Sequence, residues 1–250
     1  MPRQCLFCPN PANSLEHVWP GWILESLRAN QSVRHSIGKN PPFDVDNPAV
    51  KVRAVCRQCN NGWMSDLEST NKPLIGSLIH DVSLPLDSTQ QSNLAAWMIK
   101  VAMLIDFMNR ERPQFYRTEE RTSLRAHLAI PDGTTIWIGR NPTSNSFHAG
   151  GTDVWFDKGA VNKVAHGNVT TVIIGHLAIQ SLTIHTLISG YPNGSFNDVK
   201  IKGGQWDKLL CLVWPLGSRV NWPPPVSFTS RGALSIAGLM ERWRVGKNVA

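Results

Sequence analysis

Apolar residues in the middle of the chain recur every three or four positions, at 94, 97, 98, 101, 105 and 108. This spacing places them on one face of an α-helix, so we predict a helix over residues 94–108. Similar patterns predict further helices over residues 119–128 and 232–243. The helical patterns are separated by strand-like runs, and the mixture predicts an α+β protein.

Five runs after residue 130 have the apolar character of strands, over residues 134–139, 153–156, 169–174, 177–184 and 209–214. Residues 51–55 also alternate between polar and apolar types, which predicts a strand that leads into Cys56. Glycine and proline residues among scattered polar ones indicate a loop over residues 30–48. After Cys59, Asn60 precedes an apolar stripe that ends at Leu67, so we expect Asn60 to be the N-cap of a helix.

The pattern divides the chain into two parts. Short polar segments fill residues 1–72, and the longer helix and strand patterns fill residues 93–250, where we expect a mixed α/β domain. Pro73 and the run Pro85-Leu86-Asp87-Ser88-Thr89 indicate a linker over residues 73–92. The second part contains no phosphate-binding or dinucleotide-binding motif. Its role stays open among substrate selection, partner binding and formation of a homo-oligomer.

Composition narrows the class of protein. Hydrophobic residues make up 42% of the 250 residues, which is enough for a folded core. Residues 169–188 have the length of a membrane span, but they contain many Thr, Ser, His and Gln residues and alternate like a strand. The N-terminus lacks the apolar core of a signal peptide, so we expect a soluble, cytoplasmic protein that contacts no membrane. The net charge of +7 favours a polyanionic partner without identifying one.

Four of the five cysteines form two Cys-x-x-Cys pairs, Cys5 with Cys8 and Cys56 with Cys59. Each pair can present two thiolates to one point, which suits a tetrahedral structural zinc ion. A redox-active pair would require a βαβ pattern nearby, and none is present. Cys211 lies in an apolar run, where we expect a buried thiol that packs as a small hydrophobic group.

The segments beside these pairs carry a second pattern. Leu15-Glu16-His17-Val18-Trp19-Pro20 lies between the pairs, and Asn60-Asn61-Gly62-Trp63-Met64 follows the last cysteine. The order Cys-x-x-Cys, Glu-His-x-x-Pro, Cys-x-x-Cys-Asn resembles the HNH (ββα-metal) endonucleases of the four-cysteine zinc subtype. The likeness covers residues 5–68, and it is nearest to bacterial and phage HNH proteins with an additional C-terminal domain. It implies a zinc-clamped, treble-clef-like ββα-metal module over residues 1–72.

The resemblance also implies roles for individual residues. His17 corresponds to the general base that takes a proton from the water attacking a DNA phosphodiester. Glu16 corresponds to an acidic metal ligand and Asn60 to the residue that completes the ligand pair. The implied ion is Mg²⁺ or Mn²⁺, both of which prefer oxygen ligands.

Two positions depart from the family pattern. Lys51 occupies the position where an Asn usually orients the histidine, and a lysine cannot accept an imidazole N–H. Asn47, Asn61 or a backbone carbonyl are alternatives for that contact. Asn60 replaces the more frequent final His, and Glu68 is an alternative acidic ligand further along the expected helix.

Other interpretations stay open at this point. With Lys51 in place of Asn, the region can also be a catalytically inactive zinc module that binds nucleic acid or a protein partner. RNA is an alternative substrate, because a protein that contacts only the phosphate backbone distinguishes ribose from deoxyribose poorly. Trp19, Trp22 and Trp63 can stack on bases or fill the core of the module. The basic residues of the module can contact phosphates or remain solvated: Arg3, Arg28, Arg34, Lys39, Arg53 and Arg57. His35 lies in the expected loop, where we expect it to be exposed. The histidines beyond residue 72 form no pair at metal-ligand spacing on one helix, and we expect them to be structural.

Overall fold

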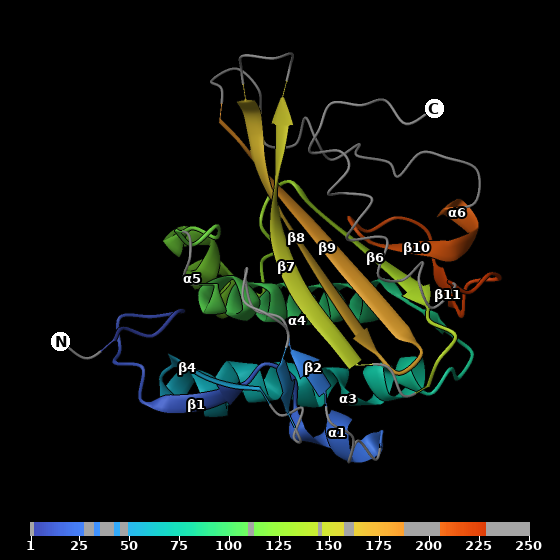
Figure 1. Ribbon diagram of the computed structural model, residues 1–250, viewed down its shortest axis with the longest axis horizontal. Coiled ribbons are helices and arrows are strands. Elements are labelled where there is room, and N and C mark those ends of the chain that lie inside the picture. The colour runs from blue at the N-terminus through green and yellow to red at the C-terminus, as the bar shows by residue number, and fades with distance from the viewer. Residues whose placement is uncertain are drawn as a thin grey trace. The chain divides into compact units, whose positions relative to one another are not determined.

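The computed structural model describes residues 3–27, 33–35, 43–45, 50–109, 113–144, 147–157, 163–187 and 206–228. It contains helices and strands in mixed order (Figure 1), in agreement with the predicted α+β class. Two compact units are formed, and each combines two segments of the chain. The first unit comprises Met1–Ser77 and Ser92–Ile130, and the second comprises Leu78–Gln91 and Pro131–Ala250.

In the first unit, strand β1 (Ser14–His17) pairs with strand β4 (Lys51–Val55) in antiparallel fashion. The limits of β4 coincide with the predicted strand. The chain between the two strands contains helix α1 (Gly21–Ser26), strand β2 (Val33–His35) and strand β3 (Phe43–Val45).

Strands β2 and β3 pair with each other, so the prediction of a loop over residues 30–48 is wrong for the described residues. Apolar residues occupy both strands, and Val33 pairs with Val45 in the register. Each strand is only three residues long, which is too short to give a recognisable alternation in the sequence.

A helical segment follows β4, with a kink at Gly62, whose backbone angles are not helical. It begins with helix α2 (Arg57–Cys59), passes through the π-helical turn η1 (Asn60–Met64) and continues as helix α3 (Ser65–Ile79). Cys56 is the N-cap, since its Sγ atom accepts the N–H of Cys59 at 3.4 Å. The prediction that Asn60 caps the helix is therefore wrong, because Asn60 already has helical backbone angles.

Helix α4 (Ser88–Met108) and helix α5 (Thr118–His127) confirm two of the predicted helices. Helix α4 begins six residues before the predicted start, because Asp87 and Gln90 cap it reciprocally with bonds of 2.8 and 2.9 Å. Its central residues are buried on every side, so the apolar stripe predicted from spacing covers only part of its buried surface.

The region expected to be a linker, residues 73–92, contains regular structure. Helix α3 continues through Pro73 to Ile79, and strand β5 (Leu84–Leu86) and the first turn of α4 follow. The division into domains at 1–72 and 93–250 stays a prediction, since it concerns which segments fold alone.

The second unit contains a five-stranded antiparallel sheet with the order β10-β6-β9-β8-β7 (Figure 1). The five strands predicted after residue 130 are confirmed, and β7, β8 and β9 are longer than the runs that predicted them. Their bounds are β6 (Thr134–Arg140), β7 (Phe147–Asp157), β8 (Lys163–Ile174), β9 (Leu177–Thr186) and β10 (Leu210–Trp214). A short helix α6 (Trp206–Leu209) precedes β10, and β11 (Val220–Trp222) pairs with β5.

One face of this sheet carries a cluster of buried apolar side chains, with Trp137, Val154, Val169, Leu182 and Ile184 among its members. These residues come from four strands, so the cluster joins strands that are far apart in the sequence. Burial of this face is a major source of stability for the second unit.

Three smaller predictions can also be compared with the structure. Cys211 is only partly buried, because β10 is the edge strand of its sheet. Among the described residues, no helix is long and apolar enough to cross a membrane. The helix predicted over residues 232–243 lies outside the described residues.

Replacing Ile184 by Ala tests the importance of the apolar cluster. Ile184 is 1% exposed, so we expect the free energy of unfolding to fall by about 2–4 kcal/mol. The matched control is Leu187→Ala just beyond the same strand, where the side chain is 52% exposed and the expected change is within about 0.5 kcal/mol. Urea denaturation followed by tryptophan fluorescence measures both changes, and equal effects would contradict this account of the core.

Candidate functional site

The four paired cysteines meet in the first unit. Their sulfur atoms all lie within 4.8 Å of one another, and all four residues are buried. Cys8 Sγ lies 3.6 Å from Cys56 Sγ and 3.7 Å from Cys59 Sγ. Four sulfurs that surround a tetrahedral zinc ion at about 2.3 Å are separated by about 3.8 Å, so these spacings fit zinc.

The chain presents the two cysteine pairs through backbone hydrogen bonds. In the first pair, Cys5 N–H donates to the Asn10 carbonyl, and Leu6 N–H donates to the Ala54 carbonyl of β4, both at 2.8 Å. In the second pair, Cys56 and Cys59 belong to the first turn of the helical segment. The metal site therefore connects the N-terminal turn to the junction between β4 and the helix.

The thiols differ in how readily they ionise. Burial raises the pKa of Cys5 and of Cys59 above its ordinary value, which disfavours their thiolates unless a cation is present. Burial also acts against the Cys56 thiolate, but hydrogen bonds from the Cys59 backbone and the other thiols lower its pKa to about 7. Four thiolate ligands would leave a tetrahedral ion no open coordination position, as is typical of a structural zinc site.

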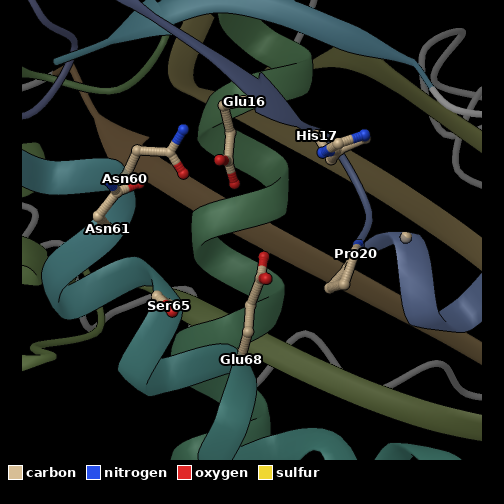
Figure 2. Close-up of a pocket in the computed structure, with 8 residues that line it drawn as sticks. Glu16, His17, Pro20, Asn60, Asn61, Ser65 and Glu68 are labelled. Atoms are coloured by element: carbon tan, nitrogen blue, oxygen red, sulfur yellow. The ribbon is translucent and has the colours of Figure 1, made fainter. Parts of the chain in front are cut away.

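A polar pocket with a volume of about 220 Å³ opens beside the cysteine cluster in the first unit (Figure 2). It is formed by the end of β1, the start of α1 and the helical segment. Its lining comprises Glu16, His17, Pro20, Gly21, Asn60, Asn61, Ser65 and Glu68. The residues predicted to act in catalysis, Glu16, His17 and Asn60, are thus brought together.

Asn60 and Glu16 point toward each other across this pocket (Figure 2). The Asn60 amide nitrogen donates to Ser14 Oγ at 2.7 Å and to the Leu15 carbonyl at 3.2 Å. Since both bonds use the nitrogen, the amide oxygen is the atom that remains for a ligand. The two hydrogen bonds also attach the helical segment to β1.

Glu16 is 4% exposed, and burial raises the pKa of its carboxyl group. The positive charge of Lys100 acts in the opposite direction. A cation near the pocket therefore favours the ionised form of Glu16, and a bound metal ion would act in the same direction.

His17 is opposite Lys51 in the β1–β4 register, which is where the sequence pattern placed the usual Asn. Burial is the main cause that lowers the pKa of His17, and the positive charge of Lys51 lowers it further. The imidazole is consequently neutral at pH 7 and able to accept a proton. Of the residues considered as a substitute for the Asn, Asn61 lines the pocket and Asn47 lies outside the described residues.

Glu68, the alternative acidic ligand, also lines the pocket. Its Oε1 atom lies 2.5 Å from the Nζ atom of Lys100, which in turn lies 3.4 Å from Glu16 Oε1. Sequence reasoning missed Lys100 as a residue of this site. The available signal was a single cation within the apolar pattern of residues 94–105, a place where a lysine needs a buried partner.

The tryptophans of the first unit take part in packing. Trp19 is buried, and Trp63 makes an edge-to-face contact with Phe7 at a centroid distance of 5.0 Å. Trp22 is partly exposed and has the Lys72 ammonium group 5.6 Å from its ring centroid. These contacts favour the core interpretation for Trp19 and Trp63.

Comparison with known proteins gives no match: no family model matches the chain, and no curated protein or solved structure shows significant similarity. The likeness to HNH endonucleases therefore depends on the sequence motifs alone. Any function has to be argued from the chemistry of this site.

Replacing one zinc ligand tests the metal centre. In Cys59→Ser, we expect zinc content to fall well below one ion per chain and the melting temperature to drop by about 10 °C or more, because zinc binding stabilises the fold. Cys211→Ser, which changes a cysteine outside the cluster, is the matched control and should retain zinc. Elemental analysis and thermal melting measure the two effects. Full zinc content in Cys59→Ser would contradict the four-cysteine site.

Proposed function

We propose that this protein is a metal-dependent endonuclease of the HNH type that hydrolyses DNA phosphodiester bonds. The observation that carries the proposal is the convergence of Glu16, His17 and Asn60 on one polar pocket beside a four-cysteine cluster. The three residues come from two segments more than 40 positions apart, and the motif order in the sequence anticipated their meeting.

The local architecture supports the same class of enzyme. An antiparallel strand pair, β1 with β4, is followed directly by a helical segment. One cysteine pair precedes β1, and the other lies at the start of the helical segment. This is the order expected of a zinc-clamped ββα-metal module. The cysteine cluster joins the N-terminal turn to the start of the helical segment, and the polar side chains line the pocket beside it.

The pocket suits one divalent ion with oxygen ligands. Glu16 supplies a carboxylate and Asn60 an amide oxygen, and the open volume leaves the other positions to water and to a phosphate oxygen. When bound, Mg²⁺ or Mn²⁺ would stabilise the negative charge that develops on the scissile phosphate. The chain itself contributes the orientation of both ligands, since β1 holds Glu16 and the two bonds to Ser14 and Leu15 hold Asn60.

His17 is the proposed general base. His17 lies at the end of β1 and lines the same pocket as Glu16 and Asn60, the proposed metal ligands. A neutral imidazole can accept the proton of a water molecule that attacks phosphorus, which increases the nucleophilicity of that water. Lys51, opposite His17, cannot accept the imidazole N–H, so it does not replace the Asn of the family pattern in orienting the ring.

The alternative function is a zinc-stabilised binding module without catalysis, for nucleic acid or for a protein. The observation that favours it is the presence of Lys51 opposite the proposed base. RNA is the alternative substrate for the nuclease, because a phosphodiester and a metal ion are common to both reactions.

The first test compares plasmid cleavage by the wild type and by His17→Ala, with Mg²⁺ or Mn²⁺ and at equal zinc content. Loss of the general base should slow nicking by about 100-fold or more. The matched control is His127→Ala, an exposed histidine on α5 that does not line the pocket, and it should cleave at the wild-type rate. Substrates of duplex DNA, single-stranded DNA and RNA are compared in parallel.

Two results would contradict the nuclease. One is equal cleavage by the wild type and His17→Ala, which would indicate a contaminating enzyme. The other is the absence of cleavage of all three substrates by folded, zinc-loaded protein, which would favour the binding module.

Replacing Lys51 by Asn tests the departure from the family pattern. The change removes a positive charge opposite His17 and introduces an amide oxygen that can accept the imidazole N–H. We expect the rate of plasmid nicking to rise by about tenfold, because an oriented base contributes more to catalysis. Arg53→Asn is the control, since Arg53 is also an exposed residue of β4 but does not pair with His17. A rate that is unchanged or lower in Lys51→Asn would show that the ring is oriented by another group.

A further inference from the structure

Lys100 is an unusual residue, because its side chain is completely buried although it carries a charge. It belongs to helix α4, outside the segment that carries the HNH-like motifs. The helix runs behind the pocket (Figure 2), and the Lys100 ammonium group reaches Glu16 and Glu68. A buried lysine is rarely tolerated without such partners.

The two ion pairs differ in geometry. The contact with Glu68 is 2.5 Å and the contact with Glu16 is 3.4 Å, so Glu68 forms the closer ion pair. Glu68 is more exposed than Glu16, at 22% against 6% of the side chain. The more accessible carboxylate, which a metal ion would reach first, is thus the one that Lys100 holds most closely.

The charges around the pocket also favour a single carboxylate ligand. Glu16 and Glu68 supply two carboxylates, and Lys100 supplies one buried ammonium group that lies 3.4 Å from Glu16 and 2.5 Å from Glu68. One negative charge is left for a divalent ion. Among the described residues, the only group of three or more His, Cys, Asp or Glu side chains that could hold a metal is the cysteine cluster, so the pocket itself offers no such set.

We propose that Lys100 is a positioning residue that makes Glu16, and not Glu68, the carboxylate ligand of the divalent ion. This inference deepens the proposed function and rests on its metal site. Lys100 binds Glu68 as a counterion and keeps it from the ion, while Glu16 remains directed at Asn60. Helix α4 is consequently part of the site, and residues 1–72 alone lack one of its charged groups.

Removing the ammonium group should raise the affinity for a divalent ion, whereas a substitution that merely disrupted the site would lower it. In Lys100→Met, Glu68 loses its counterion and a positive charge near the ion disappears. Both changes strengthen the attraction between the pocket and a dication, so we expect Mn²⁺ to bind about tenfold more tightly or better. Isothermal titration of the full-length, zinc-loaded protein with Mn²⁺ measures this affinity without nucleic acid. Mn²⁺ prefers oxygen ligands, so it does not compete for the thiolates.

The control for a buried change in the same helix is Met98→Leu, a substitution of similar volume that should leave Mn²⁺ affinity unchanged. Mn²⁺ affinity in Lys100→Met that is unchanged or weaker would overturn the proposal. Thermal melting and zinc content are measured on each variant to establish that it is folded.

Two further variants keep the proposal testable if Lys100→Met does not fold. Glu16→Gln should abolish Mn²⁺ binding, because it removes the only carboxylate ligand. Glu68→Gln keeps an oxygen that accepts from Lys100 but removes one negative charge, so its Mn²⁺ affinity should fall by about tenfold at most, the effect expected of a charge alone. A larger loss in Glu68→Gln, or retained binding in Glu16→Gln, would overturn the assignment of the ligand.

Failure of the proposed function gives a different result. A protein that binds Mn²⁺ with this mutational pattern but cleaves no substrate would refute the nuclease and leave the role of Lys100 intact. A protein whose cleavage depends on His17 but whose Mn²⁺ binding is lost in Glu68→Gln would refute the role of Lys100 alone.

Discussion

The arrangement of the first unit depends on the meeting of four cysteine thiols from two distant segments. Cys8 and Cys56 are 48 positions apart, and their sulfur atoms are 3.6 Å apart. Bringing buried thiolates so close together is unfavourable without a cation, because like charges repel in a medium of low dielectric constant. A tetrahedral metal ion reverses the sign of this interaction, and its binding energy becomes part of the folding energy.

The cysteine cluster also determines where the polar pocket forms. Cys59 is followed directly by Asn60, so the turn that carries two of the clustered cysteines also places a side chain of the pocket. Asn60 then donates to Ser14 and Leu15 on β1, and the next residues of that strand are Glu16 and His17. The pocket is thus built from residues adjacent to the cysteine cluster, and a metal ion held there would keep its polar side chains in defined positions although the module has a small core.

Much of this could be predicted from the sequence, because it depends on local patterns. The spacing of the cysteines predicted their cluster, and alternation predicted β4 with the correct limits. The β2–β3 pair was missed because each strand has three residues, and the cap at Cys56 was missed because a thiol is not a usual N-cap.

Lys100 could not be assigned to the pocket, since its contacts with Glu16 and Glu68 span 84 and 32 positions. Such a contact depends on the packing of helix α4, and the sequence pattern of that helix shows only that it is buried. The roles of the pocket residues follow from their chemistry and not from the fold, so cleavage and metal-binding measurements are the experiments that assign them.

The β1–β4 pairing has a consequence for the chain that lies between these two strands. The segment with α1, β2 and β3 leaves the module at the end of β1 and returns at the start of β4, and the two ends are neighbours because His17 pairs with Lys51. Each doubling of the length of a connection adds only about 0.6 kcal/mol to the entropic cost of closing it, so additional residues between β1 and β4 destabilise their pairing little. The part of the segment that follows α1 can therefore lengthen or shorten during evolution, while Pro20 and Gly21 at the start of α1 keep their places in the lining of the pocket.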